Sequence, residues 1–562
     1  MPIKTLLTTA LTLALTCNVA AQKYTAPSTP EIGSENTVTA DPPQPHPNTK
    51  PCVVQLFSNY TFADFSGKPF SYTASCPGPW EKVILQADFS VTAGRQFDRT
   101  ANIWIGGTNV YFGTTAEPSA TVSRNWHVEN DLTDYAPLFA SSQTGEVDLG
   151  NLVNSTYTGI LYGSAELDFY PAAKRHSARR TADEVFPLSA GQNGGTVALG
   201  NSAAVLSTTI TLPTNVERAY LDVIAQSQSG DEFWYTCVPN DVSGELQSCG
   251  GGAFRESQVT IDGTPAGIAP VYPWIYTGGI DPYLWRPIPD ISTLNFTPYR
   301  VDLTPFAGVL SNGVPHTVGV SVFGANNYFS TTATLLIYQD HDSAQVTGEV
   351  TKNTIGTPNP SVTENLTTAA DGSVTGSVST KSSRQFQLAG YAETSHGRVQ
   401  SSVVQDIDFL NVQNFNITSA VYVQDIKQNT TISSRSSSFG HRANRAAYSH
   451  QEWPLNANIS LAFNADSIPQ TTTIRQSLRK SDAVAEQGSA PYWSQLTNTD
   501  NAADTLVFTP DFSAVLSHQD QSSSQKYYFL DSTGRCYSRS ITSKDGALTA
   551  VTDGANCDSD GN

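Results

Sequence analysis

The sequence has few of the residues that build long helices. Its 562 residues include one methionine, the initiator, and only 14% of them are charged, whereas Gly, Thr, Ser and aromatic residues are plentiful. No segment beyond residue 30 repeats Leu, Ala, Glu and Lys with the 3.6-residue period of an amphipathic helix. Short apolar runs between Gly, Pro and Asn are typical of strands and hairpins instead. The chain is long enough for about two to four domains with their own cores, and we predict an all-β fold.

The sequence also lacks a long hydrophobic run after its N-terminus. No later segment has 18 apolar residues in succession, as a membrane-spanning helix would need. At the N-terminus, Lys4 precedes an apolar stretch from Leu6 to Val19, and small residues follow at Ala20 and Ala21. This order is typical of a signal peptide over residues 1–21, and the Thr residues that interrupt the stretch disfavour a permanent anchor. We therefore expect a soluble protein that is secreted or that stays in the lumen of the secretory pathway.

Several common catalytic motifs are missing. The nine His residues form no His-x-His or His-Glu-x-x-His pattern, which a catalytic metal would use. The sequence has no Gly-x-Ser-x-Gly elbow and no phosphate-binding loop, and His127 and His316 are interpreted as packed or surface residues. No metal or organic cofactor is implied. A net charge of −19 argues against nucleic acid as a partner, because its phosphates would be repelled.

Cysteines and glycosylation motifs agree with export. Removal of Cys17 with the signal peptide leaves six cysteines in three sequence-local pairs, which favours three disulfides among fifteen possible connectivities. These cysteines are Cys52, Cys76, Cys237, Cys249, Cys536 and Cys557. Asn-x-Ser/Thr motifs predict surface glycosylation at Asn59, Asn154, Asn295, Asn365, Asn416, Asn429 and Asn458. Chance occurrence in a Thr-rich chain explains some of these motifs, but seven in an exported protein favour some occupancy.

Composition divides the chain into segments. A Pro- and Thr-rich linker or extended lead-in precedes two strand-rich regions, and a basic segment that contains Lys174–Arg180 separates these regions as a linker or a processing site. The last third begins with a Ser- and Thr-rich stretch, expected as a linker over 351–382, and continues as a β-rich C-terminal domain. The predicted boundaries are 22–51, 52–171, 172–186, 187–345 and 346–562.

The two strand-rich regions contain an internal repeat. Arg99–Thr108 matches Arg255–Thr264, and farther along Asn130–Tyr135 matches Val301–Phe306. The offset between the matched segments is larger for the second pair by about the length of one loop. Two matches in the same order are not expected by chance. We predict two homologous antiparallel β-sandwiches in tandem.

Carboxylates and aromatics in turns are the candidate functional residues. Asp98 and Arg99 directly precede a predicted strand, and Arg255 with Glu256 occupies the matching turn of the second sandwich. If the sandwiches lie side by side, these rims face one cleft. Other turn residues suit the stacking and hydrogen bonding of sugars, namely Glu117, Trp126, Asp231, Glu232, Trp234, Tyr276, Trp285 and Arg286. Any one of them alone is more typical of a surface ion pair or a core aromatic, and only their clustering favours a site.

At these residues the chain resembles the peptide-N-glycanase A family of plants and fungi. The similar segments are Phe97–Trp104 with Gly106-Gly107, Thr115–Pro118, Asp231–Trp234, Phe254–Glu256 and Ile275–Pro287, within a strong resemblance over residues 50–345. The resemblance implies tandem jelly-roll sandwiches and an amidase that acts on N-glycosylated peptides or proteins. Bacterial PNGase F, a remote relative of the family, has its catalytic aspartate in an Asp-Arg-x-Ala-Asn segment, which matches Asp98–Asn102 here and implies that Asp98 is catalytic.

The resemblance leaves the assisting carboxylates open. Where the bacterial relative has assisting glutamates, this chain reads Cys249–Gly252 and Tyr157–Gly159. The candidates to replace them are therefore Glu256, which is the first choice, Glu232 and Glu117. Arg99 or a neighbouring donor is expected to stabilise the oxyanion. Two alternatives are a glycan-binding sandwich protein without catalysis and a structural cell-surface or wall protein.

Overall fold

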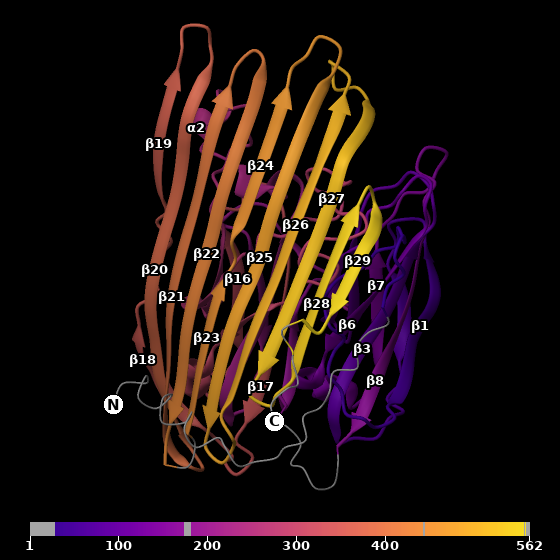
Figure 1. Ribbon diagram of the computed structural model, residues 1–562. Coiled ribbons are helices and arrows are strands. Elements are labelled where there is room, and N and C mark those ends of the chain that lie inside the picture. The colour runs from indigo at the N-terminus through magenta and orange to yellow at the C-terminus, as the bar shows by residue number, and fades with distance from the viewer. Residues whose placement is uncertain (1–28, 173–180, 442–443, 556, 558–562) are drawn as a thin grey trace.

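The computed structural model describes residues 29–172, 181–441, 444–555 and 557. The predicted signal peptide and Lys174–Arg180 lie outside the described residues. Strands dominate the molecule, as Figure 1 shows, and a broad sheet of long strands lies in front of two smaller β-sandwiches. In the described part of the chain, no helix is long and apolar enough to cross a membrane.

The first sandwich consists of two four-stranded antiparallel sheets. One sheet has the strand order β1-β8-β3-β6, and the other has the order β2-β7-β4-β5, which is the arrangement of a jelly roll. The strands are β1 (Cys52–Phe62), β2 (Lys68–Tyr72), β3 (Trp80–Val91), β4 (Thr100–Ile105), β5 (Thr108–Thr114), β6 (Arg124–Asp131), β7 (Gln143–Leu149) and β8 (Leu161–Pro171).

The second sandwich repeats this order as β10-β17-β12-β15 and β11-β16-β13-β14, with β9 added beside β17. The repeated segments of the sequence lie on corresponding elements, β4 with β13 and the end of β6 with the end of β15, which confirms the tandem jelly rolls. The strands are β9 (Glu184–Leu188), β10 (Val197–Leu199), β11 (Val205–Ile210), β12 (Val216–Ser227), β13 (Glu256–Ile261), β14 (Thr264–Pro270), β15 (Tyr299–Asp302), β16 (His316–Phe323) and β17 (Phe329–Gln339).

The described helices are short and connect strands. They are η1 (Thr133–Phe139), η2 (Ser229–Asp231), η3 (Trp234–Thr236), α2 (Asn240–Ser243), η4 (Thr304–Phe306) and α3 (Ala307–Leu310). Helix η2 and helix η3 lie on either side of Glu232, so this glutamate occupies a tight turn at the rim of the second sandwich.

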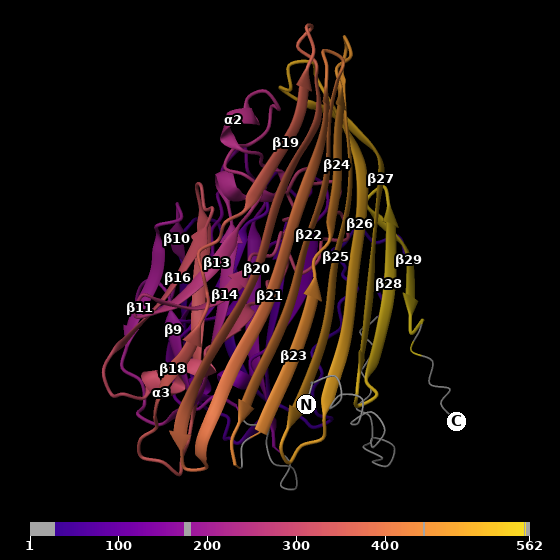
Figure 2. The same cartoon turned by 90° about the vertical axis from the view of Figure 1, so that its left-hand side faces the viewer.

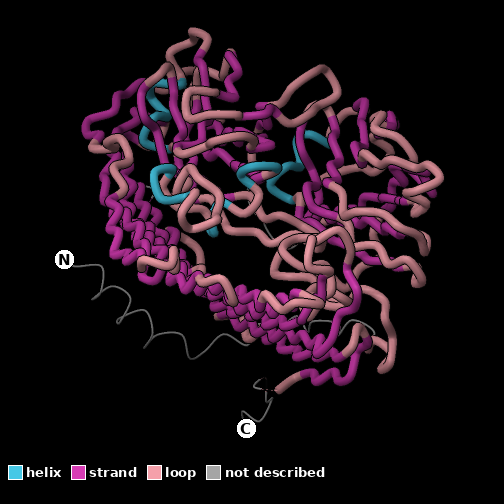
Figure 3. Tube along the Cα trace, turned by 90° about the horizontal axis from the view of Figure 1, so that it is seen from above, coloured by secondary structure: helices cyan, strands magenta, loops and turns pink. Residues whose placement is uncertain are grey.

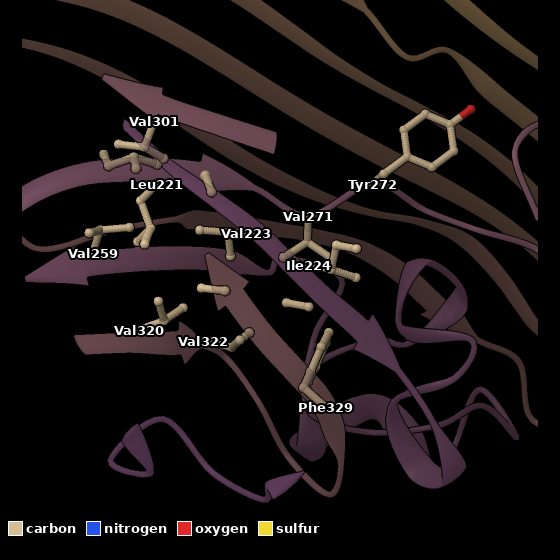
Figure 4. Close-up of a cluster of buried hydrophobic side chains, with 14 of the residues drawn as sticks. Leu221, Val223, Ile224, Val259, Val271, Tyr272, Val301, Val320, Val322 and Phe329 are labelled. Carbon is tan, nitrogen blue, oxygen red and sulfur yellow. The ribbon is translucent and has the colours of Figure 1, made fainter. Parts of the chain in front are cut away.

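Alternating apolar residues fill the layer between the two sheets of the second sandwich. Figure 4 shows Leu221 and Val223 of β12 with Val259 of β13 and Val320 of β16 in this layer, and all four are buried. Successive side chains of a strand point to opposite faces, and β17 uses both of its faces. Leu335 and its alternate neighbours join this core, whereas Leu336 and Tyr338 join the core of the first sandwich. The two sandwiches therefore pack side by side across β17.

The C-terminal third forms one twelve-stranded antiparallel sheet, which we call the long sheet. Figures 2 and 3 show it as a single curved layer along one side of both sandwiches. Its strands are β18 (Thr347–Asn353), β19 (Ser361–Thr368), β20 (Val374–Thr394), β21 (Gly397–Ile417), β22 (Val421–Phe439), β23 (Asn444–Glu452), β24 (Leu455–Ala462), β25 (Ile468–Glu486), β26 (Tyr492–Phe508), β27 (Val515–Asp531), β28 (Cys536–Lys544) and β29 (Ala547–Asp553).

The expectation of a linker over 351–382 is wrong, because most of these residues lie in β18, β19 and β20. Along β20 and β21, buried and exposed residues alternate. Many of the Ser and Thr residues that suggested a linker lie at exposed positions of these strands, whereas Thr380 and Ser382 are buried. Thr in particular is common in strands.

Amide side chains of the long sheet bind the backbone of loops in the second sandwich. Asn411 Nδ2 donates to Tyr235 O at 2.8 Å, and Gln476 Nε2 donates to Pro273 O at 2.7 Å. The other such contacts are Gln413 with Cys237 O, Gln424 with Thr236 O and Gln521 with Arg286 O. A buried carbonyl without a partner is costly, so these amides fix the loops in place.

The N-terminal segment is extended and lies against the long sheet. The Ala40 amide donates to Gln525 Oε1 at 2.6 Å. The Gly33 amide donates to Leu548 O at 2.7 Å, and the Leu548 amide donates to Ser34 O at 2.9 Å. Residues 29–51, expected as a linker or lead-in, therefore join the long sheet to the first sandwich.

The disulfides and the glycosylation motifs can now be placed. The bonds Cys52–Cys76, Cys237–Cys249 and Cys536–Cys557 confirm the three local pairs. Of the seven motif asparagines, Asn59, Asn154, Asn365 and Asn416 are exposed, whereas Asn295, Asn429 and Asn458 are half-buried. The exposed group is the more accessible to a glycosylating enzyme.

Candidate active site

Asp98 lies where the two sandwiches meet. The Gly278 amide, in the long loop between β14 and β15, donates to Asp98 Oδ2 at 3.1 Å. Next to it, Thr277 Oγ1 donates to Thr115 O at 2.6 Å, so the two rims are joined by hydrogen bonds on both sides of the carboxylate. The expectation that Asp98 faces the second sandwich is confirmed by these contacts.

Gly278 is a glycine because the two carboxylates of the site approach its Cα closely. A Cβ at this position would lie 2.5 Å from Asp98 Oδ1 and 2.9 Å from Glu117 Oε2. Such distances are shorter than van der Waals contact, so a side chain here would displace at least one of the two carboxylates.

Three carboxyl groups form the chemical centre of the site. The Asp98 backbone amide donates to Glu117 Oε2 at 3.1 Å. Burial and the negative charge of Asp98 raise the pKa of Glu117 to about 8, and the same two causes raise the pKa of Glu232 to about 7. Burial also raises the pKa of Asp98, but the Gly278 amide and the Arg99 charge oppose this rise. The two glutamates therefore keep their protons at acidic pH, and the charge of Asp98 favours this form in both.

Two arginines lie beside this group. Arg286 Nη2 contacts Glu117 Oε1 at 3.2 Å and donates to Pro118 O, and its charge lowers the pKa of Glu117 against the larger effect of burial. Arg99 Nη2 donates to Gln96 Oε1 at 2.7 Å. Within the described residues, the buried Nε of Arg99 has no hydrogen-bond partner. The charge of Arg99 lowers the pKa of Asp98, so its guanidinium lies beside that carboxylate.

The predicted aromatic residues divide into two groups. Tyr276 is buried near the carboxyl groups, and its hydroxyl donates to Ser227 O at 2.5 Å. Trp285 Nε1 donates to Gly279 O at 2.9 Å and closes the turn that follows Gly278. Trp126 and Trp234 lie in the apolar cores, where only 5% and 1% of their surfaces are exposed. These two tryptophans support the sandwiches and do not join the carboxyl group cluster.

Asp231 and Arg255 form a fully buried ion pair. Arg255 Nη2 lies 2.8 Å from Asp231 Oδ1. Asp231 Oδ2 accepts the backbone amides of residues 326–328 at 2.7–3.0 Å. This pair fixes the turn that carries Glu232, so its effect on the site is indirect.

We expect Asp231→Ala to destabilise the protein by about 3–5 kcal/mol, because Arg255 would be left buried and unpaired. Differential scanning calorimetry would show a lower unfolding temperature for this variant. The exposed Asp241, on the neighbouring helix α2, provides the control Asp241→Ala, which should unfold as the unaltered protein does. Equal unfolding temperatures for both variants would contradict a structural role for Asp231.

Glu256, the first candidate for the assisting carboxylate, has its partner in the long sheet. It is 98% buried and pairs with Arg384 of β20, and burial raises its pKa to about 7. Arg99 and the Gly278 amide lower the pKa of Asp98. The charge of Asp98 in turn raises the pKa values of Glu117 and Glu232. The structure thus brings together Asp98, Arg99, Glu117, Glu232, Tyr276 and Arg286, while Glu256 lies under the long sheet.

Sequence reasoning missed Gly278 and Thr277 as functional positions. A pair of glycines within a run of bulky aromatic residues was the available signal, because it marks a close approach of backbone to another group. Among the described residues, no three His, Cys, Asp or Glu side chains are grouped as metal ligands would be.

Comparisons with known proteins agree on one family. The family described as peptide N-acetyl-β-D-glucosaminyl asparaginase amidase A matches residues 41–355, which include both sandwiches and only the beginning of the long sheet. A curated protein of Prunus dulcis, peptide-N4-(N-acetyl-β-glucosaminyl)asparagine amidase A, is 32% identical over 388 residues, which cover 65% of this chain and 67% of that protein.

Solved structures of bacterial enzymes are also similar. PNGase F of Flavobacterium meningosepticum matches with a TM-score of 0.35 and 14% identity, over 52% of this chain and 96% of that one. PNGF-II matches with a TM-score of 0.35 and 12% identity, over 52% of this chain and 66% of that one.

Proposed function

We propose, because this chain belongs to the peptide-N-glycanase A family, that it hydrolyses the amide bond between asparagine and the first N-acetylglucosamine of an N-glycan. It is a hydrolase of amide C–N bonds. The observation that carries the assignment is the Asp98 carboxylate, which accepts the Gly278 amide at the junction of the two sandwiches and whose charge raises the pKa values of Glu117 and Glu232.

In the proposed reaction, Asp98 acts as the general base. It takes a proton from a water molecule whose oxygen forms a bond with the side-chain carbonyl carbon of the glycosylated asparagine. The guanidinium of Arg99, half-buried beside Asp98, stabilises the negative oxygen of the tetrahedral intermediate. Positioned donors of this kind lower the barrier because they need no reorganisation during the reaction.

Glu232 is the proposed general acid. It is half-buried, keeps its proton up to about neutral pH, and is not tied by an arginine as Glu117 is. Its proton passes to the amide nitrogen as the C–N bond breaks, so the products are an aspartate side chain and a glycosylamine. General acid–base assistance contributes about 10²–10⁴-fold. Glu117 orients the backbone of Asp98 through the hydrogen bond to its amide.

Incubation with a defined N-glycopeptide tests the proposal directly. Mass spectrometry should find the free glycan and a peptide one mass unit heavier than the asparagine form. The rate should pass through a maximum below about pH 7. Above that pH it falls because Glu232 loses its proton, and at lower pH it falls because Asp98, whose pKa burial raises, becomes protonated and cannot act as the base. A rate that keeps rising to alkaline pH would contradict a protonated glutamate as the acid, and bound glycopeptide without a mass change would leave only glycan binding.

We also place the protein in the secretory pathway or outside the cell. Three disulfides support this location, since disulfides persist in oxidising compartments. The N-terminal signal pattern and the exposed glycosylation motifs are consistent with the same route.

A further inference from the structure

The loop that carries Arg286 is held by the long sheet at three points. The ring of His518 on β27 stacks on Tyr283, with 3.7 Å between ring centroids and an angle of 18° between planes. Gln521, also on β27, donates from Nε2 to Arg286 O at 2.9 Å. Asp504 of β26 faces Asp281 at the start of the same turn. Two adjacent strands of the long sheet therefore hold residues 281–286.

These contacts continue from the long sheet to the catalytic carboxylate. The guanidinium carbon of Arg286 lies 4.8 Å from the ring centroid of Tyr283, within the range of a cation–π interaction. Arg286 in turn contacts Glu117 at 3.2 Å, and Glu117 accepts the Asp98 amide at 3.1 Å. Four direct contacts therefore connect His518 to Asp98, through Tyr283, Arg286 and Glu117.

The buried pair of Asp281 and Asp504 also fixes the 281–286 turn to the long sheet. Both side chains are almost fully buried, and in the described part of the chain Asp281 Oδ2 and Asp504 Oδ2 have no other hydrogen-bond partner. A proton on one carboxyl group lets it donate to the other, and burial raises the pKa of both groups in favour of that form. His518 Nδ1 lies 3.4 Å from Asp504 Oδ1, so the pair and the ring stack form one cluster.

We propose that the long sheet is a positioning element of the active site, in which His518 and Asp504 hold the 281–286 turn so that Arg286 stays against Glu117. The proposal rests on the proposed function for its kinetic consequence. Both residues lie outside the segment that the family match covers, so the two sandwiches alone do not contain the complete support of the site. Small displacements of positioning groups can cost about 10²-fold in rate.

Three full-length variants test the proposal. His518→Ala removes the stacked ring, His518→Phe keeps a flat ring without the imidazole, and His450→Ala is the control, since His450 lies on β23 of the same sheet and contacts Ser433. With an N-glycopeptide substrate, we expect kcat to fall about tenfold in His518→Ala with KM changed less than about twofold, which indicates a lost transition-state contribution. The kcat of His518→Phe should stay within about threefold of that of the unaltered protein, and the kcat of His450→Ala should equal that of the unaltered protein.

Hydrogen–deuterium exchange of peptides that cover residues 279–287 gives a readout that does not depend on activity. Exchange should be faster in His518→Ala than in the unaltered protein, and His518→Phe should restore it. Unchanged exchange, or an unchanged kcat despite faster exchange, would overturn the proposal, as would equal losses in the Ala and Phe variants. If the unaltered protein cleaves no glycopeptide, the proposed function fails, and the exchange of the His518 variants still decides whether the sheet holds the turn.

Discussion

Asp98→Asn should reduce glycan release by at least about 10²–10⁴-fold, the contribution of a general base. Asparagine has nearly the same shape as aspartate and its side-chain oxygen can still accept the Gly278 amide, which lies 3.1 Å from Asp98 Oδ2. It cannot take a proton from water at the pH of the reaction. The expected result is therefore a folded protein that binds a glycopeptide without cleaving it, as measured by kcat/KM from mass spectrometry.

Asp88→Asn is the matched control for this experiment. Asp88 is an exposed aspartate on β3 of the same sandwich, and its carboxylate contacts His127 at 2.8 Å on the surface. Both variants should unfold at the temperature of the unaltered protein, and Asp88→Asn should keep full activity. Near-normal cleavage by Asp98→Asn would remove Asp98 from the mechanism.

The two jelly rolls were predictable because their signals are local. The repeated segments Arg99–Thr108 and Arg255–Thr264 contain a strand, a tight turn and the first residue of the next strand, and they begin the hairpins β4–β5 and β13–β14. A hairpin depends on neighbouring residues, so its pattern survives in each copy of the repeat. The order of strands then follows from the resemblance to the peptide-N-glycanase A family.

The long sheet could not be predicted in the same way. Residues along β20 alternate between more buried and more exposed positions, and β19 and the start of β20 are rich in Ser and Thr. The same composition is typical of linkers. A strand of the long sheet differs from a linker because loops around Tyr235 and Pro273 cover the inner face of the sheet. Contacts between residues so far apart in the sequence leave no local pattern.

The candidate site shows the same limit at single residues. Arg99 and Arg255 occupy equivalent positions in the repeat, yet Arg99 borders the Asp98 cluster whereas Arg255 pairs with a buried Asp231. Likewise, Glu256 lies at a sandwich rim as expected, but the long sheet covers that rim and supplies Arg384. Sequence repeats locate a residue along a strand, and the neighbouring elements decide whether its charge is available to a substrate.

Gly278→Ala should abolish most of the activity without a change in any ionisable group. The added methyl group would lie 2.5 Å from Asp98 Oδ1 and 2.9 Å from Glu117 Oε2, so at least one of the two carboxyl groups must move. A misplacement of about 1 Å can cost about 10²-fold in rate, and we expect kcat/KM for the glycopeptide to fall by at least that factor.

Gly244→Ala separates this effect from a general intolerance of added methyl groups. Gly244 follows helix α2 in the same sandwich with an ordinary φ of −67°, and a Cβ there would meet no atom within 4 Å. This control should keep normal cleavage and stability. If Gly278→Ala also cleaved the glycopeptide at a normal rate, the close contact of Gly278 with Asp98 and Glu117 could not be the arrangement that performs the reaction, because a methyl group cannot share that space with both carboxyl groups.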